Sequence, residues 1–257
     1  MAEKIIYYGY TDTGKKRDIN QDSILMKAEG ENGIFCVADG MGGHSHGEIA
    51  SSLIVERLSE WADSNLFSEK DGVKIPEDRF DSLCDSFEEC IHMINEEIRR
   101  EYCIDCVCGS TLVALLIAGR KYAAYSVGDS RIYRKSGKEF MQITKDQVWQ
   151  NQPEIMSTLS ENEMKKHPDF GKLTNAVGAF DHIKINTVTG TMKDTDTFTL
   201  CSDGIYKCYT DFSLKWAHRC INAEKNTSNF EKTINQIKKH VDKKGAPDNY
   251  SIIIVGR

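Results

Sequence analysis

The chain has 257 residues, of which 40% are hydrophobic and 28% are charged, and its formal net charge is −6 at pH 7. This composition is typical of a folded globular protein, and the length is compatible with one domain, so we expect a single domain over residues 1–257. The acidic balance and the lack of a dense Lys/Arg block argue against nucleic acid or an anionic membrane as the main partner. No run approaches about 18 apolar residues, and residues 1–10 lack a secretion-signal core, so we expect a cytoplasmic protein.

The nine cysteines are odd in number and scattered along the chain. They are typical of reduced thiols that serve as small core residues. Cys103 and Cys106 form a C-x-x-C pair, but no second pair and no nearby histidines complete a zinc site. We therefore interpret C-I-D-C-V-C as thiols that precede a strand.

The first third of the chain predicts two strands and two helices. Strand-like apolar runs cover residues 4–10 and 33–38, and the second run stops at Asp39. Apolar residues recur at helical spacing over residues 47–65 and again over residues 78–101. The second helix should present one continuous apolar stripe to a core.

Four short apolar runs follow, at residues 111–118, 121–127, 131–134 and 138–143. Short turns separate them, which predicts an antiparallel meander. The pattern then becomes polar and weakly periodic over residues 144–175, where Ser160 and Glu163 form a capping box for a short helix. We expect this stretch to interrupt the sheet and to lie over a cleft.

Strands resume at residues 183–188 and 197–201. A helix should begin near Ser228, with Glu231 completing a capping box, and end by Gly245. A last strand at residues 251–255 closes the chain. Two groups of antiparallel strands with long helices predict an α+β fold, a four-layer α-β-β-α sandwich with two mostly antiparallel central sheets flanked by helices.

Four aspartates stand beside a glycine, a serine or an asparagine: Asp39, Asp129, Asp203 and Asp248. Three of them end apolar runs and the fourth precedes one, so all four can lie at strand ends around one cleft. Carboxylate and carbonyl oxygens, without clustered His or Cys, suit Mg²⁺ or Mn²⁺. Carboxylates that converge on two such ions can activate a water for hydrolysis of a phosphate ester.

Seven motifs stand in the order found in metal-dependent type-2C (PPM) serine/threonine protein phosphatases. They are R-D-I-N-Q-D at 17–22, V-A-D-G-M-G-G-H at 37–44, G-S-T at 109–111, G-D-S-R at 128–131, L-T-N-A-V-G at 173–178, C-S-D-G at 201–204 and G-A-P-D-N at 245–249. One such motif alone would be uninformative. The ordered set resembles this family over nearly the whole chain, and the short chain resembles the stand-alone bacterial members.

The resemblance implies a site for two metal ions. Asp39 would bridge the two ions, Asp203 and Asp248 would complete one coordination sphere, and the Gly40 carbonyl would contribute to the other. A glycine at this position lets the backbone turn its carbonyl toward an ion. Asp22 would lie near the same ions, directly or through water.

The resemblance also assigns a substrate contact and a further ion. Arg17 would bind the substrate phosphate, for which a forked guanidinium is suited. Asp129, together with Asp203, would hold a third and weaker ion. Arg17, Asp39 and Asp203 are thus the expected catalytic residues, although each aspartate alone could equally be a turn or capping residue.

Three positions depart from the family pattern. Met41 stands where many eukaryotic relatives carry a histidine that is proposed to protonate the leaving group, and His44 and His46 nearby are more typical of a solvated loop. Gln21 replaces a common glutamate, which removes one negative charge near the ions. Gln147 replaces a common histidine at the start of a segment, about 145–176, that resembles the flap of bacterial members.

The expected activity is hydrolysis of phosphoserine and phosphothreonine by a water that bridges two Mg²⁺ or Mn²⁺ ions, without a covalent phosphoenzyme. The expected partners are phosphoproteins, namely a serine/threonine kinase or its substrates, and the expected state is a monomer. One alternative is a pseudophosphatase that binds phosphorylated or kinase partners without turnover. Another is a phosphatase for small phosphorylated metabolites.

Overall fold

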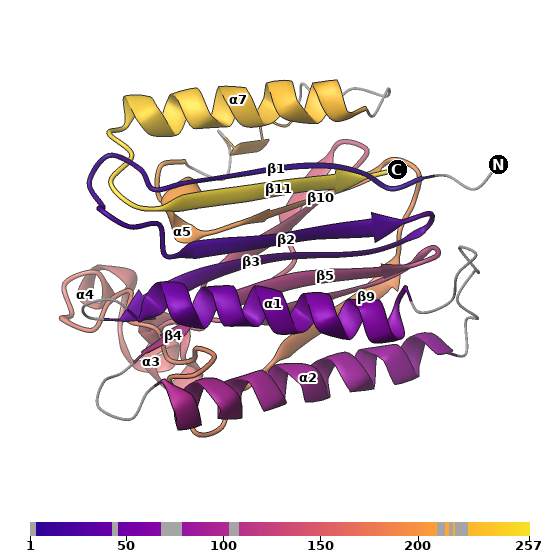
Figure 1. Ribbon diagram of the computed structural model, residues 1–257. Helices are drawn as coiled ribbons and strands as arrows, with labels where there is room; N and C mark the ends of the chain where they lie inside the picture. Colours follow the sequence, from indigo (N-terminus) through magenta and orange to yellow (C-terminus); the bar gives the residue numbers. More distant parts are fainter. Residues whose placement is uncertain are drawn as a thin grey trace.

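The computed structural model describes residues 4–42, 46–67, 79–102, 108–209, 214–215, 218 and 226–257. Two antiparallel sheets lie face to face, with helices on both outer sides (Figure 1). From top to bottom in Figure 1, the layers are helix α7, a five-stranded sheet, a six-stranded sheet, and helices α1 and α2. The predicted four-layer α-β-β-α sandwich is confirmed.

Each sheet combines strands that are distant in the sequence. The five-stranded sheet has the order β1 (Ile6–Asp12), β11 (Tyr250–Gly256), β10 (Asp196–Cys201), β7 (Arg131–Ser136) and β8 (Glu139–Gln142). The six-stranded sheet has the order β2 (Asp22–Glu29), β3 (Asn32–Gly42), β5 (Leu112–Ala118), β6 (Lys121–Val127) and β9 (Asn186–Thr191), and β4 (Cys108–Ser110) pairs with the end of β3. The first and last strands of the chain therefore pair with each other.

The helices cover the outer faces of the sheets. The longer ones are α1 (Gly47–Asn65), α2 (Arg79–Glu101) and α7 (Thr227–Lys243), and the short ones are η1 (Trp149–Asn151), α3 (Pro153–Thr158), α4 (Glu161–Met164) and α5 (Asp203–Tyr206). No helix within the described ranges combines the length and the apolar character that crossing a bilayer requires.

Three apolar layers hold the sandwich together, and β3 contributes to two of them. Phe35 and Val37 belong to the layer between the two sheets, whereas Ile34, Cys36 and Ala38 face α1 and α2. Successive strand residues point to opposite faces, so a strand covered on both faces must be apolar throughout. This explains the continuous apolar run in the sequence and fixes the strand that carries Asp39 and Gly40.

The predicted meander is wrong at one point. Strand β6 pairs with β9 in the six-stranded sheet, whereas β7 pairs with β8 and β10 in the other sheet. The chain crosses between the sheets at Gly128, which has a φ of 94° that favours glycine. Two strands that are adjacent in sequence are therefore separated, and Asp129 follows at the crossing.

Other boundaries also differ from the sequence-based prediction. Strands β2 and β4 were not predicted, and β9 covers residues 186–191 rather than 183–188. The capping box of Ser160 and Glu163 is confirmed at the start of α4. Helix α7 instead begins after Asn226, whose side chain accepts the backbone N–H of Asn229 at 2.9 Å, so the predicted box at Ser228 is wrong.

The expectation that all cysteines are reduced is wrong for Cys108, which is part of a disulfide. Cys36 and Cys201 are buried free thiols, as expected. Cys103 and Cys106 of the C-x-x-C pair lie outside the described residues. The expectation rested on composition, which does not test whether any two sulfur atoms lie within bonding distance.

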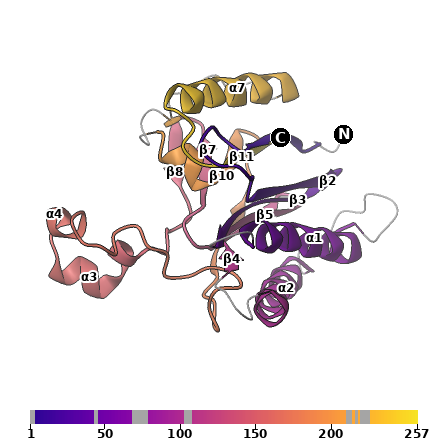
Figure 2. The same cartoon turned by 60° about the vertical axis from the view of Figure 1, so that its left-hand side comes forward.

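Residues 145–176 interrupt the order of the strands between β8 and β9, and we call them the projecting arm. Figure 2 shows that α3 and α4 extend outward from the two sheets rather than fold back over them. Inside the arm, the rings of Trp149 and His167 stack at a centroid distance of 4.1 Å. That this segment acts as a flap over a cleft stays a prediction.

Candidate metal centre

Five aspartates predicted as metal ligands come from five different segments. Asp22 begins β2, Asp39 lies in β3, Asp129 follows β6, Asp203 begins α5 and Asp248 precedes β11. Asp22 and Asp39 stand directly opposite each other in the β2–β3 register, so their side chains share one face. Like charges that are paired across strands lower the stability of a sheet. This pair therefore does not serve to stabilise the fold, which indicates a functional role.

The five carboxylates form one electrostatic neighbourhood, which we call the carboxylate cluster. Burial raises the pKa of Asp39 well above its usual range, and the charges of the other four aspartates raise it further. Burial likewise raises the pKa of Asp22 to about 6, with contributions from Asp203 and Asp248. The pKa of Asp129 is raised by burial and then by the charge of Asp203.

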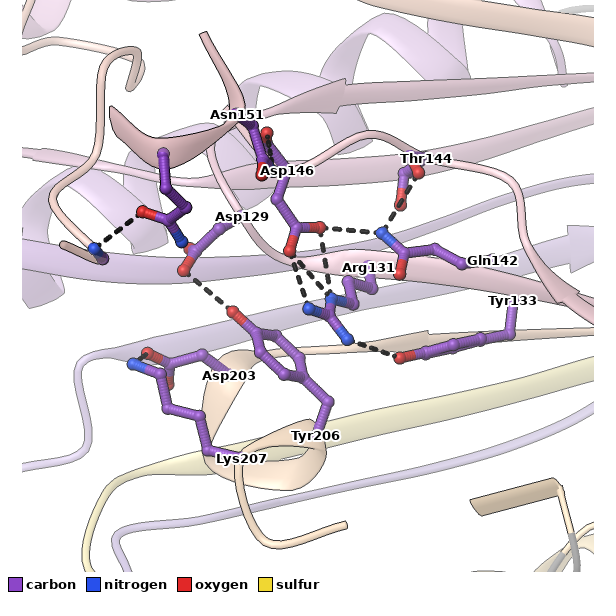
Figure 3. Close-up of polar contacts among 12 residues, drawn as sticks. Asp129, Arg131, Tyr133, Gln142, Thr144, Asp146, Asn151, Asp203, Tyr206 and Lys207 are labelled. Atoms are coloured by element: carbon purple, nitrogen blue, oxygen red, sulfur yellow. Dashed lines mark hydrogen bonds and ion pairs between the residues drawn. The ribbon is translucent and has the colours of Figure 1, made fainter. Parts of the chain in front are cut away.

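The charges of the cluster are met by the chain's own hydroxyls and cations. Among the residues that the structure describes, no three His, Cys, Asp or Glu side chains form a ready-made metal-ligand group. Ser202 donates to Asp22 at 2.7 Å, and Arg17 binds Asp248 at 2.9 and 3.0 Å. Tyr206 donates to Asp129 at 2.8 Å, and Lys207 binds Asp203 (Figure 3). A divalent cation would have to replace several of these contacts.

The donor set fits a hard cation. Oδ1 of Asp22 is buried and has no hydrogen-bond partner, which is costly for a charged oxygen. The backbone beside Asp39 is closely packed, because a Cβ on Gly40 would lie 2.1 Å from the carbonyl oxygen of Gly47 and 2.7 Å from that of Gln21. Carboxylate oxygens on such a fixed frame are the ligands that Mg²⁺ and Mn²⁺ prefer.

Arg17 reaches the cluster from an exposed loop. Its guanidinium contacts both carboxylate oxygens of Asp248 while about half of its side chain stays exposed. Asn249 shapes this loop, since its side-chain amide donates to the carbonyl oxygens of Thr13 and Ile19 at 2.8 and 3.0 Å. It also accepts the backbone N–H of Gln21 at 2.9 Å. Asn249 was missed as a site residue, although it stands inside the A-P-D-N motif.

The positions near Asp39 that depart from the family pattern are structural neighbours of the cluster. Met41 is partly buried in β3, and His46 precedes α1 as its capping residue. His44 lies outside the described residues. The side-chain amide of Gln21 donates to Glu48 at 3.2 Å, so a carboxylate of α1 stands beside the amide that replaces the common glutamate.

A second group of polar side chains joins the cluster to the base of the projecting arm (Figure 3). The hydroxyl of Tyr206 donates to Asp129, and its ring lies under the guanidinium of Arg131, with the ring centroid 3.7 Å away. Arg131 in turn binds Asp146 through Nε and Nη2, the shortest contact being 2.7 Å. These partners were not predicted from the sequence, although Arg131 stands in the G-D-S-R motif and Asp146 directly precedes Gln147.

Comparisons with known proteins agree with this architecture. The family model described as Protein phosphatase 2C matches residues 13–248. The protein phosphatase PhpP of Streptococcus pneumoniae is 30% identical over 198 residues, which cover 76% of this chain and 76% of PhpP.

Solved structures share the fold. The serine/threonine phosphatase of S. agalactiae superposes with a TM-score of 0.81 at 23% identity, covering 98% of this chain and 99% of that one. The catalytic domain of PstP, solved with two manganese ions, gives a TM-score of 0.76 at 23% identity, with 98% of each chain covered. With a family model that spans most of its length, the chain belongs to the protein phosphatase 2C family.

Proposed function

We propose that the protein is an Mg²⁺- or Mn²⁺-dependent protein phosphatase that hydrolyses phosphoserine and phosphothreonine in cytoplasmic phosphoproteins. The observation that carries the proposal is the gathering of five carboxylates from five segments, with Asp22 directly opposite Asp39. A sheet tolerates such a pair when a cation offsets the repulsion. The names of the relatives and the manganese ions of PstP support the same function.

Each residue of the site would have its own role in binding the metal ions or the phosphate. Asp39, Asp203 and Asp248 would hold two ions together with the Gly40 carbonyl, Asp22 would support them, and Asp129 with Asp203 would hold a third. When bound, such ions supply Lewis acidity and a water activated for attack on phosphorus. Arg17 would orient the phosphate, because its planar donors can fork onto two oxygens once Asp248 turns to an ion.

The described cysteines nearest the cluster do not offer a thiolate for a covalent route. Burial raises the pKa of Cys201 to about 12 and that of Cys36 still further, so both stay protonated at neutral pH. The sequence also has no C-x₅-R arrangement. Direct hydrolysis by water is therefore the favoured route.

The test removes one charge at a time from the cluster. Asp39→Asn and Asp203→Asn should each lower turnover of p-nitrophenyl phosphate and of a phosphothreonine peptide by more than about a thousandfold, because charge stabilisation at the reacting group is the dominant catalytic effect. Circular dichroism and the melting temperature should show that the fold persists. EDTA should abolish turnover by the unaltered protein, and Mn²⁺ should restore it.

Asp63→Asn is the matched control, because Asp63 is an exposed residue of α1 and pairs with Lys27 away from the cluster. This variant should keep full activity. Full activity of both Asp39→Asn and Asp203→Asn would contradict the assignment of the catalytic site to the carboxylate cluster. Binding of the phosphopeptide without turnover by the unaltered protein would favour the pseudophosphatase, and a preference for sugar phosphates over phosphopeptides would favour the metabolite phosphatase.

A further inference from the structure

A polar pocket of about 590 Å³ lies beside the carboxylate cluster, between the start of the projecting arm and the chain that leads into β9. Its lining includes Lys145, Gln147, Asn175, His182 and Lys184. None of the five clustered aspartates lines it. The pocket is therefore a separate hollow, and most of its lining residues are polar, with two lysines, one histidine and two acids among them.

The floor of the pocket is held by three amide contacts that converge on Gln147 and Asn175. The side-chain amide nitrogens of both residues donate to the carbonyl oxygen of Lys184, each at 2.8 Å. Asn175 also donates to Oε1 of Gln147 at 2.8 Å, and Asn175 is buried. The backbone that presents Lys184 is thus fixed, although its side chain reaches solvent.

The same floor joins the pocket to the carboxylate cluster. Gln147 exchanges two hydrogen bonds with Gly128, one from its backbone N–H at 2.9 Å and one to its Oε1 at 2.7 Å. Gly128 immediately precedes Asp129. Asp146, which also lines the pocket, reaches Asp129 through Arg131 and Tyr206 (Figure 3). Two chains of direct contacts therefore link the floor of the pocket to Asp129.

Two lysines and two acids line the pocket, and Arg131, which lies outside the lining, neutralises one of the acids. Lys145 and Lys184 are exposed, and neither forms an ion pair with another described residue. The charge of Asp146 is met by Arg131 at 2.7 Å. Glu154 is the remaining acid of the lining. Because the chain as a whole has a net charge of −6, these two lysines would offset the field that repels an acidic substrate.

We propose that this pocket binds an aspartate or glutamate side chain of the phosphoprotein substrate, with Lys145 and Lys184 as the residues that select it. The proposal rests on the proposed phosphatase function. An extended chain advances about 3.3 Å per residue, so an acidic residue about three positions from the phosphorylated one can reach the pocket. The protein would thus prefer phosphoserine and phosphothreonine in acidic surroundings.

The experiment compares three phosphothreonine peptides that differ only in flanking residues: acidic, neutral and basic. We expect kcat/KM to favour the acidic peptide over the neutral one by about fivefold, mainly through KM, because exposed ion pairs each contribute a factor of a few. The preference should shrink in high salt. The double variant Lys145→Glu/Lys184→Glu should reverse the order of the acidic and basic peptides. Each rate is divided by that protein's turnover of p-nitrophenyl phosphate.

Lys166→Glu is the matched control, because Lys166 is an exposed lysine of the same arm that does not line the pocket. It should keep the acidic preference. Equal kcat/KM for the three peptides, or a preference that the double variant leaves unchanged, overturns the pocket assignment while leaving the phosphatase intact. If the unaltered protein releases no phosphate at all, the proposed function fails, and fluorescence anisotropy of the same peptides then decides whether the pocket selects acidic chains.

Discussion

The carboxylate cluster and the projecting arm meet at Gly128 and Gln147, yet they are built in opposite ways. Asp39 lies in β3, and Asp203 and Asp248 lie within two residues of β10 and β11, strands that are buried over most of their length. In the arm, η1, α3 and α4 contain no buried residue. The cluster is therefore positioned by the whole sandwich, whereas the arm is held by local contacts.

This difference separates two tasks. A site that brings like charges together needs a frame that cannot relax, and two packed sheets provide it. A surface with few buried apolar contacts has a low local free energy of opening. It can also accept other residues at little cost to the fold, so differences in substrate preference are more easily accommodated in the arm than in the cluster.

The largest expected contrast comes from one substitution in each region. Gly40→Ala should lower the free energy of unfolding by more than about 3 kcal/mol, since the new Cβ would lie 2.1 Å from a backbone oxygen that cannot move without shifting α1. Gly171→Ala, in the arm, meets nothing within 4 Å and suffers only from its φ of 82°. We expect a cost of about 1 kcal/mol there. Urea denaturation of both variants measures the difference, and equal losses would contradict the comparison.

The next largest effect is a pH dependence of the free energy of unfolding, which arises from a buried histidine. His218 donates from Nδ1 to the carbonyl oxygen of Leu214 and accepts from Thr199 at Nε2, and burial lowers its pKa from 6.5 to about 4. Between these values the unfolded chain binds the proton and the folded chain does not. Acidification from pH 6.5 to pH 4 should therefore remove up to about 3 kcal/mol of the free energy of unfolding.

Urea denaturation between pH 4.5 and 6.5 tests this dependence. His218→Gln should flatten the slope of stability against pH, whatever it does to stability at neutral pH. His92→Gln, at an exposed position of α2, should keep the slope of the unaltered protein. An unchanged slope in His218→Gln would show that other groups govern the acid response.

The smallest effect concerns the link between the two regions. Asp146→Asn removes the carboxylate that Arg131 binds at 2.7 Å, so the free energy of opening at the base of the arm should fall by about 1–2 kcal/mol (Figure 3). Hydrogen exchange should quicken at the amides of Gln147 and Thr174, which bond across that base, and not in β3. Asp181→Asn, which breaks the exposed pair with Arg99, is the control. Faster exchange both at the base of the arm and in β3 would mean that the two regions open together, with the same free energy of opening.

Much of the fold could be predicted from the sequence, for identifiable reasons. Helix α1 matches its predicted range because its apolar residues repeat at helical spacing, and β3 was predicted because both of its faces are buried. Strand β2 was missed because D-S-I-L-M-K-A-E neither alternates nor forms a continuous apolar run. The crossing at Gly128 was missed because strands that are adjacent in sequence usually pair, and the positive φ of that glycine is not visible in the sequence.

The site was predictable in part. Motif order indicated the aspartates that the fold gathers, but their roles as ligands stay predictions. The sequence did not indicate the partners that meet their charges, such as Tyr206 and Lys207, because a single turn of helix α5 brings them in. Gln147 appeared only as a departure from a family pattern. Its contacts with Gly128 and Lys184 depend on three segments that come together only in the folded chain.

The pairing of the first strand with the last has a consequence for biosynthesis. Strand β11 fills the space between β1 and β10, and Asp248 meets Arg17 just before it (Figure 1). Until β11 has been synthesised and has left the ribosome, the five-stranded sheet lacks a central strand and is split. The contact between Arg17 and Asp248, and with it the complete carboxylate cluster, would thus form only after β11 has emerged.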